Sequence, residues 1–139
     1  MQKILSILLI IFIGCAGDFK KKKEVKPALS CKFYDNGQLK SEDNYKEGKR
    51  NGVRKIWNKK GQLNYEVSFK DGEKDGLSRK WDDNGQLFYE VIFKAGEKNG
   101  LYLRYYKNGQ LHHKGNYIDG EKEGLFKTYQ DDGQLKFEG

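Results

Sequence analysis

Two adjacent histidines are the residues of this chain best suited to acid–base or metal chemistry. His112 and His113 are its only histidines, and an imidazole can act as a general base or bind a metal ion near neutral pH. Neighbouring side chains of a β-strand point to opposite faces of the sheet. We therefore expect that the pair cannot bind one ion together. The sequence predicts no metal site and no serine or cysteine activated by a histidine.

The segment 71–76 resembles the start of a calcium-binding loop. It reads Asp-Gly-Glu-Lys-Asp-Gly and places carboxylates at alternate positions, as calcium loops do. The corresponding segment 47–52 reads Glu-Gly-Lys-Arg-Asn-Gly, with cations where such a loop needs oxygen ligands. The glycines also lack the spacing of a phosphate-binding loop. We interpret both segments as turns.

Two recurring sets of charged residues resemble acid–base pairs. They are Glu42, Glu66, Glu90 and Glu138, with Lys46, Lys70 and Lys94 near the first three. Cross-strand pairing of opposite charges on a polar sheet face explains such columns, at about 0.2–1 kcal/mol for each pair. We interpret the two sets as structural.

Aromatic residues give the strongest indication of a binding surface. One column consists of Phe33, Trp57, Trp81, Tyr105 and Tyr129, and we expect it to face Leu39, Tyr65, Tyr89, His113 and Phe137. Such a column forms the hydrophobic spine of a sheet, and Trp and Tyr also dominate the energetically important positions of interfaces. The two roles are compatible. The predicted binding face comprises Trp57, Tyr65, Trp81, Tyr89, Tyr105 and Tyr129.

These residues recur because the chain is a tandem repeat. The triplet Gly-Gln-Leu occurs five times, each 24 residues after the last, at Gly37, Gly61, Gly85, Gly109 and Gly133. Two further series of glycines keep the same interval, beginning at Gly48 and Gly52. A constant period of this size indicates repeat units that bury their apolar faces only against their neighbours.

Each repeat is predicted to form two strands. In the second copy, apolar residues alternate with polar ones from Leu63 to Lys70, the third copy repeats the apolar positions from Leu87 to Phe93, and every second residue from Leu77 to Trp81 lies on one side of another strand. Strict alternation in residues of this kind is typical of a strand with one apolar face. A three-residue loop with Gly85 in the left-handed conformation places Trp81 opposite Leu87. This turn unites the aromatic columns on one face.

The other connection in each repeat, Lys70–Gly76 in the second copy, is predicted to be a loop of odd length that keeps Phe69 across from Leu77. The resulting fold is all-β. It is an elongated, twisted, single-layer antiparallel meander of about ten strands, built from 24-residue hairpin repeats over residues 29–139. No helix is expected in this part. Curvature or a partner must cover the apolar face.

The N-terminus has the features of an export signal. Lys3 precedes an apolar run, which is too short to span a bilayer and ends at Cys15. The residues Phe12-Ile13-Gly14-Cys15 resemble a bacterial lipobox, and the resemblance implies that residues 1–14 are a signal peptide and that Cys15 is acylated. The alternative is an ordinary cleaved signal. Residues 15–28 are predicted to be a lysine-rich tether.

Charge and cysteine content support an anchored protein. The formal net charge is +7; Lys3 contributes one unit and segment 18–27 contributes three, which leaves +3 on the repeats. The lysines of the tether could contact anionic lipid headgroups. The remaining +3 is interpreted as spread among mixed charges, which predicts no nucleic-acid partner.

Acylation of Cys15 excludes an internal disulfide, because Cys31 is the only other cysteine.

The recurring pattern Phe/Tyr-Lys-x-Gly-x-x-x-Gly-Leu, then Trp/Tyr, then Asn-Gly-Gln-Leu-x-x-Glu, resembles the MORN repeat from Leu29 to Gly139. The bacterial variant of this repeat, whose members are often catalogued as antitoxin-like, is the most similar form. The resemblance implies a hairpin per repeat, a single-layer sheet that scaffolds proteins or touches membranes, and no catalysis.

Together these features predict a lipoprotein of the bacterial cell envelope that faces the periplasm or the exterior. It would be anchored by Cys15 and would act as a non-catalytic scaffold for a protein partner or a membrane, with no cofactor. The alternative is an antitoxin or immunity-type inhibitor of a toxin that is itself exported.

Overall fold

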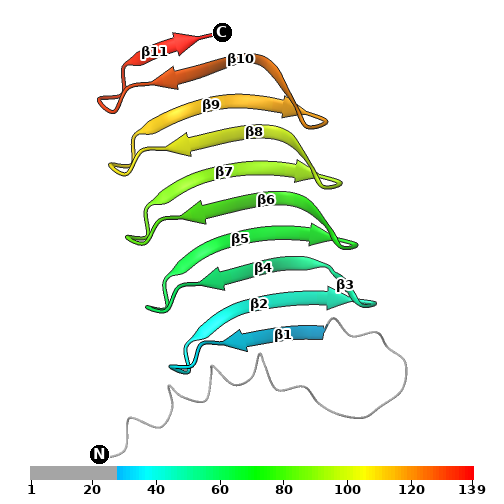
Figure 1. Cartoon of the computed structure of the whole chain (residues 1–139). Coiled ribbons are helices and arrows are strands. Elements are labelled where there is room, and N and C mark those ends of the chain that lie inside the picture. Colours follow the sequence, from blue (N-terminus) through cyan, green and yellow to red (C-terminus); the bar gives the residue numbers. More distant parts are fainter. Residues whose placement is uncertain (1–27) are drawn as a thin grey trace, which may run out of the picture.

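The computed structural model describes residues 28–139, and this part of the chain forms a single open β-sheet (Figure 1). All pairings between neighbouring strands are antiparallel, and each main strand pairs with the one that follows it along the chain. The predicted all-β meander is confirmed, and no helix occurs within the described range. The signal segment 1–14, Cys15 and nearly all of the predicted tether lie outside the described residues.

Two strands come from each repeat, as the alternating sequence predicts. The strands are β1 (Ala28–Phe33), β2 (Leu39–Lys46), β3 (Lys49–Arg50), β4 (Gly52–Trp57), β5 (Leu63–Lys70), β6 (Glu73–Trp81), β7 (Leu87–Lys94), β8 (Glu97–Tyr105), β9 (Leu111–Ile118), β10 (Glu121–Tyr129) and β11 (Leu135–Glu138). The short β3 pairs with β2 beside β4.

The turns that follow the Gly-Gln-Leu edge agree with the prediction. Gly85 has a φ of +81°, and its amide donates a hydrogen bond to the carbonyl of Asp82 over 3.0 Å. Trp81 is the register partner of Leu87. The three-residue loop with a left-handed glycine is therefore confirmed.

The opposite turns differ from the prediction. Lys70 pairs directly with Glu73, so the loop contains two residues, Asp71 and Gly72. Both have positive φ, at 51° and 97°, which is the geometry of the two-residue hairpin turn that matches the twist of the strands. Phe69 accordingly lies opposite Lys74, and the prediction that it faces Leu77 is wrong.

A β-bulge follows each Gly-Gln-Leu triplet and changes which residues share a face. Trp81 pairs with Leu87, but the preceding Lys80 pairs with Tyr89, so Phe88 is an extra residue in its strand. In a bulge of this kind two consecutive side chains oppose one residue of the neighbouring strand. The ring of Phe88 lies near Lys80 and near Tyr89, which places it on their face of the sheet.

The sheet consequently has two faces of different composition. We call the face with Tyr65, Val67, Tyr89 and Val91 the tyrosine face, and the face with Trp57, Leu63, Trp81, Leu87, Tyr105 and Tyr129 the tryptophan face. The prediction that all the aromatic columns share one face is wrong, because the extra residue in the bulge reverses the alternation after each leucine.

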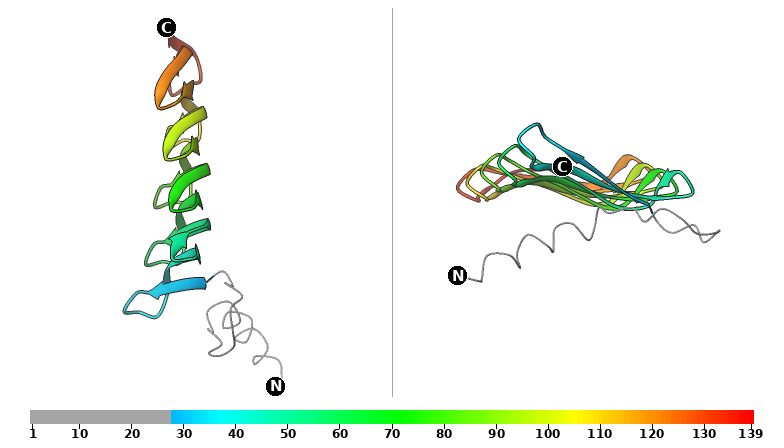
Figure 2. Two further views of the ribbon diagram at one scale, coloured as in Figure 1. Left: turned by 90° about the vertical axis from the view of Figure 1, so that its right-hand side faces the viewer. Right: turned by 90° about the horizontal axis from the view of Figure 1, so that it is seen from below.

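Burial is concentrated on the tyrosine face. Val67, Ser78 and Val91 are at most 2% exposed, and Ser41 and Asp43 are 3% exposed. By contrast, Leu125 on the tryptophan face is 62% exposed. The strands are bowed, and the sheet forms a shallow trough along its long axis (Figure 2). Because side chains converge on the inner side of a bend, the difference in burial places the tyrosine face inside the trough.

Successive repeats are joined at their tight turns as well as along their strands. The amides of Gly72, Gly96 and Gly120 donate hydrogen bonds to the carbonyls of Arg50, Lys74 and Lys98 in the preceding repeat, over 2.8–2.9 Å. The repeats therefore stack at a constant offset, which brings equivalent side chains into columns that run across the strands.

Candidate binding surface

The residues of the predicted binding face are divided between the two faces. Trp57, Trp81, Tyr105 and Tyr129 lie on the tryptophan face, where their register partners are Leu63, Leu87, Leu111 and Leu135. Tyr65 and Tyr89 pair with Ile56 and Lys80 on the tyrosine face. The prediction of one continuous aromatic surface is corrected to two separate surfaces.

A ladder of opposite charges crosses the tryptophan face. Arg79 lies between Glu66 and Glu90, with nitrogen–oxygen distances of 3.9 Å and 3.2 Å, and Lys127 contacts Glu138 at 3.0 Å. The structural interpretation of the glutamate column is supported, although the cations that pair with it are Arg79 and Lys127 rather than the lysines after each strand. The charges on this face are balanced.

Apolar side chains are also exposed on the tryptophan face. Val53, Ile92, Leu101 and Leu125 are between 36% and 62% exposed. The first three share this face through the pairs Val53–Ser68, Leu77–Ile92 and Leu101–Asn116, and Leu125 lies two residues before Lys127 in the same strand. The tryptophan face therefore combines apolar groups with paired charges.

On the tyrosine face, phenol groups are packed closely together. The hydroxyl of Ser78 donates a hydrogen bond to that of Tyr65 over 3.1 Å. Burial, and then the neighbouring Tyr65, raises the pKa of Tyr89 to about 12. Burial also raises the pKa of Tyr102. The hydroxyl groups of Tyr89 and Tyr102 therefore remain protonated at neutral pH and can donate hydrogen bonds.

A row of cations lies over the aromatic rings of the tyrosine face, at one position in each repeat. Arg50 lies 5.5 Å from the ring centre of Phe69, Lys74 lies 4.8 Å from that of Phe93, and Lys98 lies 4.6 Å from that of Tyr117. Lys122 continues the row and lies 4.8 Å from the ring centre of Phe126. These distances are those of cation–π contacts. We call Arg50, Lys74, Lys98 and Lys122 the cation row.

Charge on the tyrosine face is almost entirely positive. Eight basic residues pair in register with residues of this face: Lys32, Arg50, Arg54, Lys74, Lys80, Lys98, Arg104 and Lys122. Among the paired strand residues of the described sheet, Asp43 is the single acid on this side, and it lies 2.9 Å from Arg50 and 3.4 Å from Arg54. The interpretation of the positive charge as evenly mixed is therefore wrong.

The sequence carries a signal for this row at the repeat period. Arg50, Lys74, Lys98 and Lys122 are 24 residues apart, as are Tyr45, Phe69, Phe93 and Tyr117. The faces on which they lie could not be assigned without the position of the bulge.

The two histidines lie together, contrary to the expectation that they point to opposite faces. Their ring centres are 3.8 Å apart, and the ring of His112 also stacks on Tyr106 at 4.1 Å. The cause is the bulge, which puts two consecutive side chains on one face. Burial and nearby cations lower the pKa of both. Within residues 28–139, no three His, Cys, Asp or Glu side chains gather as a metal site requires.

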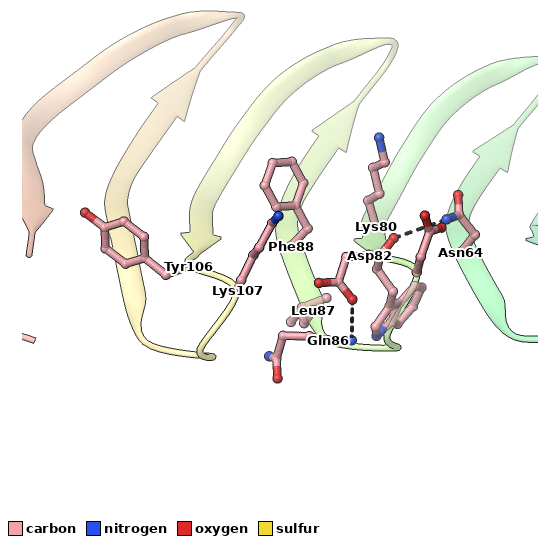
Figure 3. A pocket seen from close by; sticks show the side chains of 10 residues that line it. Asn64, Lys80, Asp82, Gln86, Leu87, Phe88, Tyr106 and Lys107 are labelled. Carbon is pink, nitrogen blue, oxygen red and sulfur yellow. Dashed lines mark hydrogen bonds between the residues drawn. The ribbon is translucent and has the colours of Figure 1, made fainter. Parts of the chain in front are cut away.

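A cleft of about 330 Å³ opens at the Gly-Gln-Leu edge, where the two faces meet (Figure 3). Its walls include Trp81, Leu87, Phe88 and Tyr106. The carboxylate of Asp82 accepts hydrogen bonds from the amides of residues 84 and 86, which holds the turn beside the cleft. The cleft is shallow and mainly apolar, and both faces contribute to it: Trp81 and Leu87 come from the tryptophan face, and Phe88 comes from the tyrosine face.

No helix in the described sheet region is long and apolar enough to cross a membrane.

The solved structures to which the chain is similar include three remote likenesses. The structure of a point mutant of S. aureus TarM in complex with fondaparinux, alpha-GlcNAc-glycerol and UDP has a TM-score of 0.43 and 11% identity, over 68% of this chain and 19% of that chain. A second TarM structure has a TM-score of 0.42 and 12% identity, over 84% and 23%. A GtfA/B complex bound to UDP and GlcNAc has a TM-score of 0.31 and 13% identity, over 89% and 28%.

The chain thus spans between 19% and 28% of the length of these structures. At such TM-scores they indicate nothing about its function. None of the curated proteins compared with the chain matches it.

A family comparison gives a direct match. The model described as "MORN repeat variant" matches residues 28–47, 50–71, 74–95, 98–119 and 122–139, which together make up more than half of the chain. These five segments coincide with the stacked hairpins of the sheet. The chain therefore belongs to the family of proteins built from variant MORN repeats.

Proposed function

We propose that the chain is a membrane-anchored, non-catalytic scaffold of the bacterial cell envelope that holds a protein partner on its sheet. The observation that carries this proposal is the sheet itself: five repeats form one continuous surface, and both of its faces are open over residues 28–139. Repeat arrays of this kind present extended surfaces of fixed geometry, which suits them to binding rather than to chemistry.

The proposed anchor is an acyl group on Cys15, which would leave the repeats in the periplasm or outside the cell. The lipobox-like residues before Cys15 and the lysines after it support this location. A bacterial lipoprotein carries more than one acyl chain, and two signals of this kind suffice for stable attachment.

Metabolic labelling with palmitate tests the anchor. We expect labelled protein in the membrane fraction, accumulation of the precursor in globomycin, and loss of both in Cys15→Ala. A secreted, unlabelled protein, or a mature protein in which Cys15 forms a disulfide with Cys31, would show that the anchor is wrong.

Crosslinking in cells tests the scaffold function. Two variants change the same two repeats on opposite faces: Trp57→Ala/Trp81→Ala on the tryptophan face and Tyr65→Ala/Tyr89→Ala on the tyrosine face. We expect one protein partner to be lost from one variant and retained by the other, while circular dichroism shows that both stay folded. Retention of every partner by both folded variants would contradict the scaffold.

A genetic test distinguishes the scaffold from the alternative, an antitoxin or immunity role. Deletion of the linked neighbouring gene would make this gene dispensable if the chain inhibits an exported toxin. A scaffold predicts that the phenotype of losing this gene persists in that background.

A further inference from the structure

We propose that the tyrosine face binds an extended acidic segment of a protein partner, which lies lengthwise in the trough with its carboxylates on the cation row. The proposal deepens the scaffold function proposed above, because it names the chemistry of the partner and the face that receives it.

The first support is charge. The paired residues of this face include eight cations and one acid, whereas the tryptophan face carries glutamates together with lysines and a single arginine, Arg79. Asp43 already contacts Arg50 and Arg54, so no acid among the paired strand residues of this face is left to neutralise the six other cations. A surface of one sign attracts and orients a partner of the opposite sign.

The second support is the fixed position of the cations. Lys74, Lys98 and Lys122 each lie within 5 Å of the centre of an aromatic ring. Contact with the ring restricts the lysine side chain before a ligand arrives, so less conformational entropy is lost when a carboxylate binds. The tyrosine hydroxyl groups beside the row offer further donors to the backbone carbonyls of a bound segment.

The third support is spacing. Strands are about 4.8 Å apart, so one repeat of two strands advances about 10 Å along the trough. A polypeptide in the extended polyproline II conformation advances about 3.1 Å per residue, and its three residues per turn point every third side chain to the same side. One carboxylate at every third residue would therefore meet one cation of the row in each repeat, and a segment of about 15 residues would cross the whole sheet.

Other anions fit the face less well. A bilayer surface calls for exposed apolar side chains that can enter it. Val53, Ile92, Leu101 and Leu125 lie on the opposite face, and among the large apolar residues exposed in the described sheet only Phe137, in the last strand, lies on this one. Single-stranded nucleic acid binds by stacking bases on aromatic rings, but cations lie over the rings of Phe69, Phe93, Tyr117 and Phe126. A carboxylate segment needs the cations rather than the ring faces.

The test uses the full chain, a fluorescent 15-residue peptide of sequence (Glu-Thr-Ser)5, and fluorescence anisotropy at low and moderate salt. Two control peptides replace every Glu by Gln or place the five Glu residues in one block. We expect the spaced Glu peptide to bind, with affinity that falls as salt rises, the block peptide to bind more weakly, and the Gln peptide not to bind.

Two double variants with the same loss of charge assign the face. Lys74→Gln/Lys98→Gln removes two cations of the row, whereas Lys70→Gln/Lys94→Gln removes two exposed lysines of the same repeats that pair with Glu73 and Glu97 on the other side of the sheet. We expect about a tenfold or greater loss of affinity in the first variant, from two lost charge-assisted hydrogen bonds. The second variant should stay within about twofold of the parent.

Several results would overturn the proposal. They are equal loss of affinity in both double variants, equal binding of the Glu and Gln peptides, or tighter binding of anionic vesicles or single-stranded DNA that is abolished in Lys74→Gln/Lys98→Gln. A partner that crosslinks in cells only to the tryptophan face would overturn this proposal and leave the scaffold function standing. Binding of the spaced peptide by a chain that fails palmitate labelling would support this proposal and show that the proposed membrane anchor is wrong.

Discussion

Gly115 is the position at which a small added side chain should most damage the sheet. A Cβ atom built on Gly115 would lie 2.2, 2.4 and 2.6 Å from three atoms of the Phe126 ring, far inside van der Waals contact. Unlike the glycines of the turns, Gly115 does not have a positive φ, so its backbone accepts other residues. The substitution Gly115→Val therefore introduces no left-handed strain, and its main cost is in packing.

The neighbouring repeat limits how much stability Gly115→Val can lose. Val91 stands at the position equivalent to Gly115, and its register partner is Tyr102, so an aromatic ring can adopt a different position beside a valine. Phe126 would have to leave the glycine and give up part of its contact with Tyr117, which has a ring-centre distance of 5.4 Å. Overpacking of this kind costs about 1–3 kcal/mol.

The expected shift in melting temperature follows from the size of the sheet. Residues 28–139 are described, and unfolding entropy is about 2.1 cal/mol/K per residue, or about 0.24 kcal/mol/K for the sheet. A loss of about 1–3 kcal/mol thus lowers the melting temperature by about 4–13 °C. Because a repeat contacts only its neighbours, the first region to open should be β10 and β11. Hydrogen exchange can detect this local loss.

Two variants complete the experiment, which is read by circular dichroism melting and urea denaturation. Asn116→Val adds a β-branched residue to an exposed position of the same strand on the other face, and it should change stability by less than about 0.5 kcal/mol. Gly115→Val/Phe126→Ser recreates the pair formed by Val67 and Ser78 two repeats earlier, and it should recover most of the loss. An unchanged melting temperature in Gly115→Val, or no recovery in the double variant, would refute the packing argument.

Three further predictions concern the turns, the histidines and the buried acid. Gly85→Ala should cost only about 1 kcal/mol, for its left-handed backbone, because nothing lies within 4 Å of the new Cβ. Gly76→Ala should cost more, because its Cβ would also lie 3.1 Å from a Cβ of the neighbouring strand. Urea midpoints measure the two costs, and equal costs would contradict the prediction. The pKa values of His112 and His113 are lowered, first by burial, so the unfolded state binds more protons than the folded state. Stability should therefore fall as the pH drops from about 7 through about 6.5 and towards the pKa values of the folded state. The loss of stability between about pH 7.5 and about pH 5.5 should shrink in His112→Asn/His113→Asn, and an unchanged pH dependence in this variant would argue against the prediction. Asp43→Ala should lower the free energy of unfolding by about 1.5–3 kcal/mol, because the buried carboxylate of Asp43 lies 2.9 Å and 3.4 Å from two arginines. A melting temperature within about 1 °C of the parent would show that these contacts contribute little.

The sequence was sufficient to predict the fold and the pairing at the Gly-Gln-Leu turns. A single period with alternating apolar residues leaves few topologies other than stacked hairpins. The three-residue loop also follows from the sequence, because it alone puts Trp81 opposite Leu87. These features depend on local rules of turn geometry and alternation, which can be read from one repeat.

The composition of the two faces could not be predicted in the same way. The bulge after Leu87 adds Phe88 to one strand and reverses the alternation beyond it, yet the residue at this place differs from repeat to repeat, so its type does not indicate a bulge. The same shift stacks His112 on His113 and moves Tyr89 away from Trp81. A one-residue change of register exchanges every later side chain between the faces, so a small local feature accounts for all of these errors.

The repeats also show that the inside of the trough is defined by pairs of residues rather than by single positions. Four cross-strand pairs occupy equivalent places at 24-residue intervals: Asp43–Arg54, Val67–Ser78, Val91–Tyr102 and Gly115–Phe126. They comprise an ion pair, an apolar residue with a small one, an apolar residue with an aromatic one, and a glycine under an aromatic ring.

Each of these pairs fills the same space between fixed backbones. The size of one side chain therefore limits the size of the side chain opposite it. The turns tolerate little variation, because their glycines hold the stacking offset, whereas the interior varies as long as both members of a pair change together. Exchanging whole pairs between repeats should therefore preserve the sheet, and exchanging single members should not. This distinction would allow the surface of the trough to be altered one repeat at a time while the cation row above it stays in place.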